Sequence, residues 1–218
     1  MPGLSPDKHK TRLAFDFEVL AAMLPHPLVS MVAYRSLRDA EQKRPLSHEH
    51  GLLGLAEVYD FTYRFPILIS EDRKVSAATA RFILDVGGKY PFSVPSAQFL
   101  GPIPWIPHVF PSGVVCLGDG WRRASGRMLL AQLAVHVAYL LNFDEPDRGQ
   151  DIEANNDALD YWRDELNSKP LHPGLEYPTL PLRVTHGVEE PAEPKGFRLL
   201  EEERATPRTG FRLLGDGS

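Results

Sequence analysis

An alternation of aromatic and polar residues between positions 57 and 65 constrains the fold of this chain more than any other feature. In the stretch EVYDFTYRF, the rings of Tyr59, Phe61, Tyr63 and Phe65 alternate with Asp, Thr and Arg. Successive side chains of a β-strand point to opposite faces of its sheet, so a period of two predicts a half-buried strand. The chain is therefore expected to contain a sheet with one face in its core.

Two further stretches carry strand patterns. ARFILDV at 80–86 alternates in the same way, and SAQFL at 96–100 predicts a third strand. The polar turn EDRK at 71–74 separates the first two strands, and Gly87 with the glycine after it ends the second. Strands joined by short turns predict an antiparallel meander. Residues 28–50 stay ambiguous, because VSMVAYRSL fits a strand or a short helix and the residues after it are typical of a polar loop.

Helical patterns flank these strands. Ser5 and Pro6 predict the start of an N-terminal helix, whose apolar stripe consists of Leu13, Phe17, Leu20 and Leu24. RMLLAQLAVHVAYLL at 127–141 is apolar nearly all round, as expected of a helix packed on a sheet. DIEANNDALDYWRDEL at 151–166 predicts a helix capped by Asp151. This order of helix, strands and helices predicts the α+β class.

Composition and charge narrow the class of protein. The 218 residues are 43% apolar and 24% charged, which is typical of a soluble domain of ordinary size with an extension. A net charge of −5, with no clustered Lys/Arg stripe, argues against nucleic-acid binding. No stretch approaches ~18 uninterrupted apolar residues, and MPGLSPDKHK lacks the apolar core of a signal peptide. We expect a cytoplasmic protein that does not bind a membrane.

The composition changes at Lys169, where Pro and Glu become frequent and periodicity is lost. This predicts a domain over residues 1–168 and an extended C-terminal segment over 169–218. The pentapeptide GFRLL occurs twice in this segment, at 196–200 and 210–214. The repeat fits a chance occurrence, a strand that pairs with the body, or a duplicated motif that offers Phe and Leu anchors to a partner.

The single cysteine of the chain, Cys116, lies in the stretch FPSGVVCLGDGW. One cysteine cannot form an internal disulfide, so the fold does not depend on oxidation. A cysteine buried among apolar side chains would be inert. PSG before Cys116 is a turn sequence and GDG after it is flexible backbone, so both flanks predict an accessible thiol.

Four segments in order resemble the ubiquitin-conjugating enzyme family. They are KYPFSVPSAQFL, IPHVFPSGVVCLGDGW, LLNFDEPD at the end of the apolar helix, and EANNDALDYWRDEL. The resemblance covers residues 55–166 and implies the fold of that family, with an N-terminal helix, a four-stranded antiparallel meander, and central and C-terminal helices. It also implies that Cys116 carries a ubiquitin-like modifier as a thioester and passes it to an amine. Such an enzyme mainly orients the reactants and stabilises an oxyanion, because a thioester sulfur leaves readily.

The chain departs from the family at His108, which stands where the resemblance places the asparagine of a His-Pro-Asn turn. That asparagine is credited with stabilising the oxyanion. A histidine can supply an N–H donor or act as a general base, and it can also merely pack the turn. The spacing from Cys116 to Trp121 is also shorter than in typical members.

The resemblance assigns further roles. It places an acidic residue that orients the incoming lysine at Asp147, with Asp144 as the second choice, although an acidic loop is often just solvated. It places contacts with a ligase or an activating enzyme at Phe92, Trp121, Arg123, Lys8, Lys10 and Arg12. His136 lies on the apolar helix and is interpreted as a packed or rim histidine.

Three functions stay open at this point. The first is a conjugating transferase, the second a catalytically silent module that binds a modifier or scaffolds a complex, and the third a cysteine hydrolase activated by His108 or His136. The expected partners of the transferase are a ubiquitin-like modifier and an adenylating activating enzyme, with a ligase and a deconjugating peptidase as further candidates. The divergence suggests a bacterial conjugation system by analogy alone. No zinc-ligand spacing and no phosphate-binding glycine loop occurs, so no cofactor or metal is expected.

Overall fold

The structure is a computed structural model that describes residues 6–24, 26–46, 56–69, 75–76, 80–87, 89–117, 127–144 and 154–181. The chain divides into two units, Met1–Val184 and Thr185–Ser218, and every described residue belongs to the first. Both GFRLL segments therefore lie outside the described residues.

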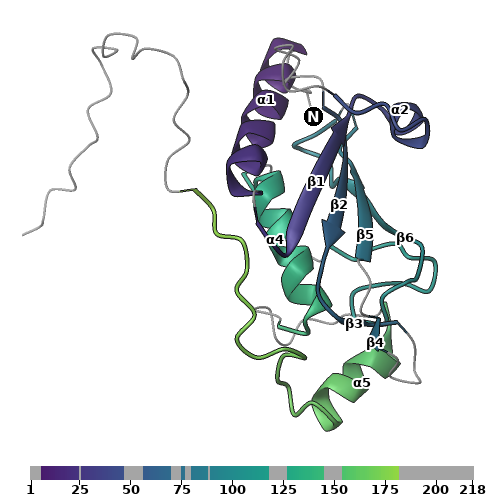
Figure 1. The fold of residues 1–218 in the computed structure, drawn as a ribbon. Coiled ribbons are helices and arrows are strands. Elements are labelled where there is room, and N and C mark those ends of the chain that lie inside the picture. The colour runs from purple at the N-terminus through teal and green to yellow at the C-terminus, as the bar shows by residue number, and fades with distance from the viewer. Residues whose placement is uncertain are drawn as a thin grey trace, which may run out of the picture. The chain divides into compact units, whose positions relative to one another are not determined.

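An antiparallel sheet of four strands forms the centre of the first unit, in the order β1-β2-β5-β6 (Figure 1). The strands are β1 Val29–Tyr34, β2 Val58–Tyr63, β5 Ala80–Asp85 and β6 Ser96–Leu100. Phe61 of β2 lies opposite Met31 of β1 and Phe82 of β5. The predicted meander is confirmed, and the ambiguous segment after residue 28 supplies its first strand. Two short strands, β3 Ile67–Leu68 and β4 Val75–Ser76, pair separately.

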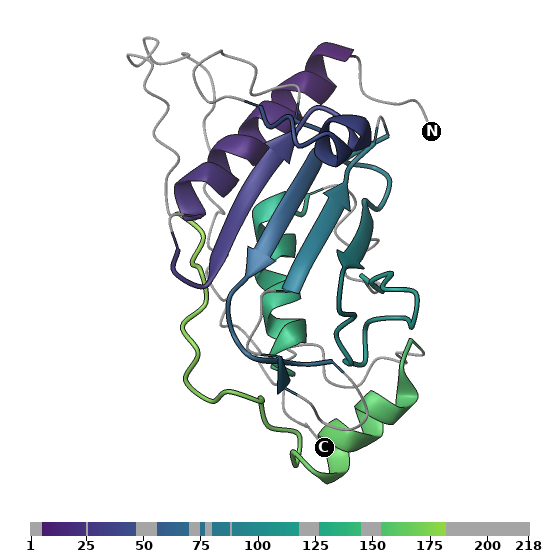
Figure 2. The same cartoon turned by 45° about the vertical axis from the view of Figure 1, so that its right-hand side comes forward.

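Two helices cover the aromatic face of the sheet. Figure 2 shows α1, Pro6–Met23, and α4, Leu130–Leu141, on the same side of the strands. Tyr59, Phe61 and Tyr63 are 0% exposed beneath them, and burial of each ring stabilises the fold by about 2 kcal/mol. Burial also raises the pKa of Tyr63, so its hydroxyl stays protonated and donates to the Ala134 carbonyl of α4 (2.9 Å). The predicted core strand and its cover of helices are confirmed.

The other face of β2 is more buried than the alternation predicted. Val58 and Asp60 point away from the aromatic layer, yet both are buried. Tyr34 and Ala40 pack against Val58 and close part of this face. Ala40 belongs to α2, Leu37–Glu41, a helix where the sequence predicted a polar loop. Ser36 caps this helix by accepting from the Asp39 N–H (3.2 Å).

The last described helix, α5 Asn156–Asp164, begins later than predicted. Its N-cap is Asn155, whose side chain accepts from the Ala158 N–H (3.2 Å), whereas the predicted cap Asp151 lies outside the described residues. Ala158 and Trp162 are buried, as the predicted apolar face requires. In Figure 1, α5 lies at the end of the sheet opposite α2.

The chain continues to pack against the body after α5. Leu171, Leu175 and Tyr177 contact the core as partly buried residues. These contacts lie beyond residue 168, the predicted end of the domain. Tyr177 packs on Tyr139 of α4 and accepts a hydrogen bond from Asn142, the residue that follows this helix.

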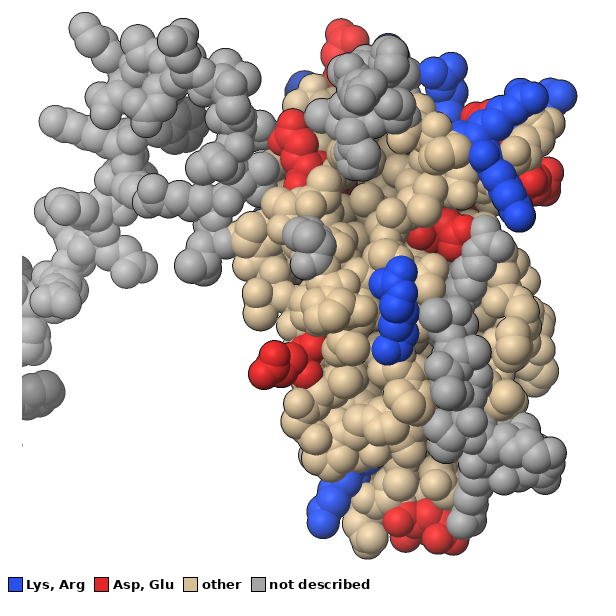
Figure 3. All heavy atoms as spheres, in the orientation of Figure 1, with Lys and Arg blue, Asp and Glu red and all other residues tan. Residues whose placement is uncertain are grey.

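The described residues include no membrane-spanning helix, and the face drawn in Figure 3 shows no basic stripe. No helix in the described part of the chain has the length and apolar character needed to cross a bilayer. On the face drawn in Figure 3, Lys and Arg lie mostly around α2, next to Asp and Glu, and most of the remaining described surface is uncharged.

Candidate active site

A tight hairpin precedes Cys116. Val109 and Val115 pair across it, and the Gly113 N–H donates to the Phe110 carbonyl to close the turn (2.8 Å). Pro111 follows Phe110, the position where proline favours a type I turn, and glycine is common at the last position of such turns. The sequence FPSG therefore encodes the reversal that returns the chain toward Cys116.

Gly113 also lets the hairpin approach β6 closely. Its φ is +83°, and a Cβ atom at this position would lie 2.8 Å from the Ile103 side chain and 2.9 Å from the Phe99 carbonyl oxygen. The Gly113 carbonyl accepts from the Phe99 N–H (2.9 Å), and the Val115 N–H donates to Ala97 (3.0 Å). The hairpin thus forms an extension of the sheet edge.

Replacement of Gly113 by alanine is expected to lower the free energy of unfolding by about 3 kcal/mol, because the new Cβ meets backbone and the residue is held at positive φ. Gly101→Ala is the matched control, since Gly101 has φ +88° with open space around it, and about 1 kcal/mol is expected there. Urea unfolding of both variants measures the difference. Equal losses would show that the close approach to β6 costs nothing.

Cys116 follows the hairpin directly and is half-buried. Its N–H donates to the His108 carbonyl oxygen (2.7 Å), and the next residue, Leu117, is buried. Backbone on both sides of Cys116 is therefore fixed, while part of the residue is open to solvent. The GDG segment after Leu117 lies outside the described residues.

His108 is buried, with 6% of its surface exposed, and its ring lies beside the ring of His136 on α4, 6.5 Å between centroids. The packing role foreseen for His108 agrees with this burial. The interpretation of His136 as a packed or rim histidine agrees with its partial burial. The oxyanion and general-base roles of His108 stay predictions.

Helix α5 supports the turn that holds His108. The Asn155 N–H donates to the Pro107 carbonyl (3.1 Å), next to His108 in the chain. Six residues further along, Tyr161 packs against Trp105, with 5.5 Å between ring centroids. The Asn155 backbone thus contacts the candidate site while its side chain caps the helix.

Of the two acidic residues predicted to follow α4, Asp144 and Asp147, the structure describes one. Asp147 lies outside the described residues. Asp144 is described, and its carboxylate accepts from the Tyr177 hydroxyl (3.1 Å) while its N–H donates to the Tyr139 carbonyl (2.9 Å). The Pro/Glu-rich composition around Tyr177 gave no local signal of this contact.

The predicted partner-binding residues differ in exposure. Phe92 is 55% exposed, and Lys8 and Lys10 are exposed on α1. Trp121 and Arg123 lie outside the described residues.

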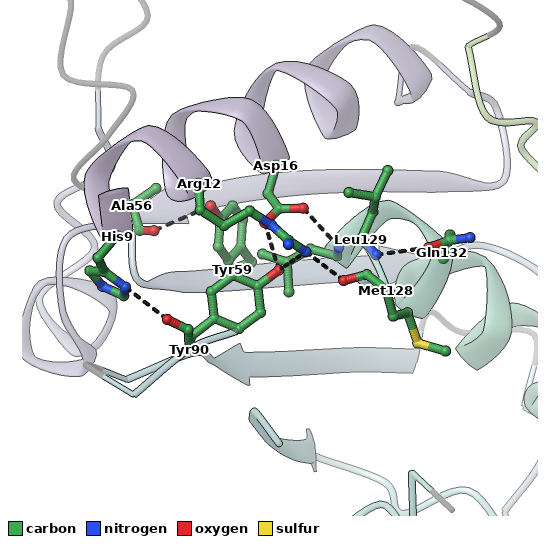
Figure 4. Close-up of polar contacts among 10 residues, drawn as sticks. His9, Arg12, Asp16, Ala56, Tyr59, Tyr90, Met128, Leu129 and Gln132 are labelled. Carbon is green, nitrogen blue, oxygen red and sulfur yellow. Dashed lines mark hydrogen bonds and ion pairs between the residues drawn. The ribbon is translucent and has the colours of Figure 1, made fainter. Parts of the chain in front are cut away.

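Arg12 does not join the exposed face of α1. Its Nε donates to Asp16 (2.6 Å), and its Nη2 donates to the Tyr90 hydroxyl (2.9 Å) and to the Met128 carbonyl (2.6 Å). Figure 4 shows the side chain between α1, Tyr90 and the segment before α4. The Arg12 guanidinium is held by internal acceptors, and its contact with a partner stays a prediction.

Asp16 is the centre of this cluster, which sequence reasoning missed. It is 0% exposed and accepts from Arg12, from the Tyr90 hydroxyl (2.5 Å) and from the Leu130 N–H (3.2 Å). Burial raises the pKa of the Asp16 carboxyl, and the hydrogen bonds from Tyr90 and Arg12 oppose that rise. Burial and the neighbouring Asp16 raise the pKa of Tyr90, so its hydroxyl stays a donor.

The described residues were also expected to show any cavity or metal-ligand group away from Cys116. A cavity of about 320 Å³ lies on the outer face of β5 and β6 beside α2, and no residue of the predicted site lines it. In the part of the chain that the structure describes, no three His, Cys, Asp or Glu residues are grouped to hold a metal ion.

Comparisons with known proteins give structural matches only. No family model matches the chain, and no curated protein matches its sequence. The chain is similar to human ubiquitin-conjugating enzyme E2 G1, with TM-score 0.43 and 17% identity over 64% of this chain and 98% of that chain. It is similar to the conjugating enzyme UbcA1 of Agrocybe aegerita, with TM-score 0.44 and 16% identity over 72% of this chain and 94% of that chain.

A third match is a ubiquitin-conjugating enzyme E2 of Plasmodium falciparum, with TM-score 0.41 and 14% identity over 60% of this chain and 96% of that chain. No bacterial protein is among these three, and the bacterial origin stays a prediction. Each of these three matched structures is a ubiquitin-conjugating enzyme.

Proposed function

We propose that this protein is a transferase of the ubiquitin-conjugating type, which carries a ubiquitin-like modifier as a thioester on Cys116. The observation that supports this most is the setting of the thiol. Cys116 is half-buried at the end of a hairpin, and its backbone is fixed to His108 by a 2.7 Å hydrogen bond. A partly exposed residue on fixed backbone is a setting in which a thiol can receive a bulky acyl group without large movement.

The reaction has two balanced steps. The Cys116 sulfur attacks the modifier's C-terminal carbonyl in its thioester with the activating enzyme, the old C–S bond breaks, and that enzyme's thiol is released. An amine of a target or ligase then attacks the new thioester, and its C–S bond breaks. The amine nitrogen gives up a proton, an amide forms, and the Cys116 thiol is regenerated. Each step passes through an oxyanion, which a nearby N–H donor stabilises.

His108 is proposed as the group that stabilises this oxyanion during transfer. Replacement by alanine is expected to slow discharge to an amine by about 10²-fold, with a smaller effect on loading, because the donor would be lost. Single-turnover loading and discharge rates measure the two steps separately. His108→Asn, which restores an amide donor, should recover part of the rate. Equal slowing of loading and discharge in His108→Ala would argue for a packing role alone.

A silent binding module is the second candidate function. It is favoured by the state of His108, the residue that stands where the family resemblance expects an asparagine. His108 is buried, and its ring lies beside that of His136. Such a module would bind a modifier without a covalent bond. Phe92, Lys8 and Lys10 are exposed and would be available for protein contacts under either function.

A loading assay separates the two functions. The protein is mixed with ATP, a candidate activating enzyme and its modifier, and run on a non-reducing gel. The transferase predicts an adduct that disappears with thiol reductant and is absent from Cys116→Ala. Modifier binding without an adduct, in a mixture where the activating enzyme is itself loaded, would support the silent module.

A further inference from the structure

The outer face of the sheet, opposite α1 and α4, holds a cavity of about 320 Å³. Alternate residues of β5 and β6 form its floor, while the residues between them are buried in the core. In the strand register, Ile83 lies beside Gln98 and Asp85 lies beside Ser96. Strand pairing therefore fixes which side chains the floor presents to solvent.

Helix α2 forms one wall of the cavity. It lies on the side of the sheet away from α4 (Figure 2), and its Ala40 packs there against Tyr34 and Val58. The Ser36 cap fixes the start of this helix. The helix packs over β1 and β2, and the cavity lies beside it over β5 and β6. A packed helix and a paired sheet thus hold the walls of the cavity in place.

Part of the lining is apolar. Leu37 of α2 is 46% exposed, Ile83 is partly buried, and Leu100 lies at the end of β6. Large apolar side chains on a concave surface favour a ligand with an apolar body. At about 30 Å³ for each water, the cavity has room for roughly ten waters, so it suits a small molecule.

The rest of the lining is rich in hydrogen-bond acceptors. Glu41 and Asp85 contribute carboxylates, and Gln98 contributes an amide oxygen, since its Nε2 donates to the Ser112 carbonyl (3.2 Å). The Asp85 Oδ1 atom accepts from the Gly87 N–H (3.1 Å). An ionised carboxylate has about four acceptor positions, so this bond leaves room for a further donor.

The charges of the lining favour a cation. Among the described residues that line the cavity, two carboxylates stand against one cation, Lys43, so the net charge of the lining is −1. A ligand with N–H donors and a positive charge matches these acceptors better than an anion does, because charge-assisted hydrogen bonds are the stronger ones. The net charge of the whole chain, −5, also attracts a cation.

We propose that this cavity binds a small organic cation, an amine with an apolar body. The ammonium group donates to the carboxylates of Asp85 and Glu41, and the apolar body lies on Ile83 and Leu37. The site does not depend on the proposed function, because no residue of the candidate active site lines it.

The test uses 2-phenylethylamine as the probe, since it combines an ammonium group with a phenyl ring. Titration of the full chain, followed by amide NMR shifts, is expected to give a dissociation constant of about 1 mM, typical of so small a ligand. The largest shifts are expected at Ile83, Asp85 and Gln98. 2-Phenylethanol, which has a similar shape and no charge, should bind at least about fivefold more weakly. Equal binding of the alcohol, or no shifts at the cavity, would overturn the proposal.

Three variants test the charges one at a time. Asp85→Asn is expected to weaken binding of the amine by about five- to tenfold, and it keeps an acceptor for the Gly87 N–H, so the strand should fold unchanged. Asp160→Asn is the matched control, because it removes an exposed carboxylate on α5, and the affinity should stay that of wild type. Lys43→Gln is expected to tighten binding by about twofold, since a like charge is removed.

The same titrations give the results that would overturn the proposal. Unchanged affinity in Asp85→Asn would reject the carboxylate contact, and weaker binding in Lys43→Gln would assign the cavity to an anion. Cavity amide shifts that depend on protein concentration without the probe would show that a second copy of the chain occupies this face. Thioester formation on Cys116 is measured separately, so neither result decides the other.

Discussion

Cys116→Ser is expected to form an oxygen ester with the modifier that is stable to thiol reductant and cleaved by hydroxide. Discharge of this ester to lysine should be slower than wild type by at least about 10³-fold, because an alkoxide is a far poorer leaving group than a thiolate. The substitution replaces sulfur by oxygen in a half-buried side chain, so the hairpin before it should fold unchanged. Loading and discharge followed on gels with and without base give both quantities.

The Cys116→Ser result is informative only beside Cys116→Ala. Alanine removes the nucleophile entirely, and no ester of any kind should then form. A thiol-sensitive adduct that persists in either variant would place the acyl group on the activating enzyme or elsewhere. It would also remove the reason for assigning a role to the hairpin between Val109 and Val115.

Asp16→Ala is expected to lower the free energy of unfolding by about 3 kcal/mol. Asp16 is 0% exposed, and its carboxylate accepts from Arg12, Tyr90 and Leu130. Removing it leaves a cation and two other donors in a region where water does not replace the lost partner. The loss should appear as a shift in the urea midpoint, with the slope of the transition unchanged.

An exposed acid–base pair on α5 provides the control for Asp16. Asp160 lies 3.8 Å from Arg163, and both side chains are more than half exposed. Asp160→Ala is expected to cost less than about 0.5 kcal/mol, since exposed pairs one helix turn apart contribute little. Asp16→Asn should fall between the two alanine variants, because it keeps an acceptor and loses the charge. If Asp16→Ala and Asp160→Ala lowered the free energy of unfolding by similar amounts, burial of the Asp16 carboxylate would not be what makes its hydrogen bonds stabilising.

Strand positions followed from the sequence because their signals are local. The alternation around Phe61 predicts β2, and SAQFL coincides with β6. The helix α2 was missed although Ser36 and Asp39 form a recognisable N-terminal cap. Five residues of helix are too few for an apolar period, so the polar residues after it dominated the prediction.

The position of Cys116 after a turn was also predictable, because the turn residues adjoin it. The contacts around Asp16 and Tyr177 were not, since their partners lie far away in the chain. Asp16 interrupts an apolar stretch in α1, which was the only local sign of a buried acceptor. Tyr177 follows a Pro-rich stretch that was read as an extended tail, and only packing against α4 shows otherwise.

The central claim is that the Cys116 sulfur carries an acyl group, and intact mass spectrometry tests it most directly. After incubation with ATP, an activating enzyme and its modifier, wild-type protein should gain the mass of one modifier less one water. The added mass should map to Cys116 and be released by neutral hydroxylamine. An adduct on lysine that survives hydroxylamine, or unmodified protein beside a loaded activating enzyme, would contradict the claim.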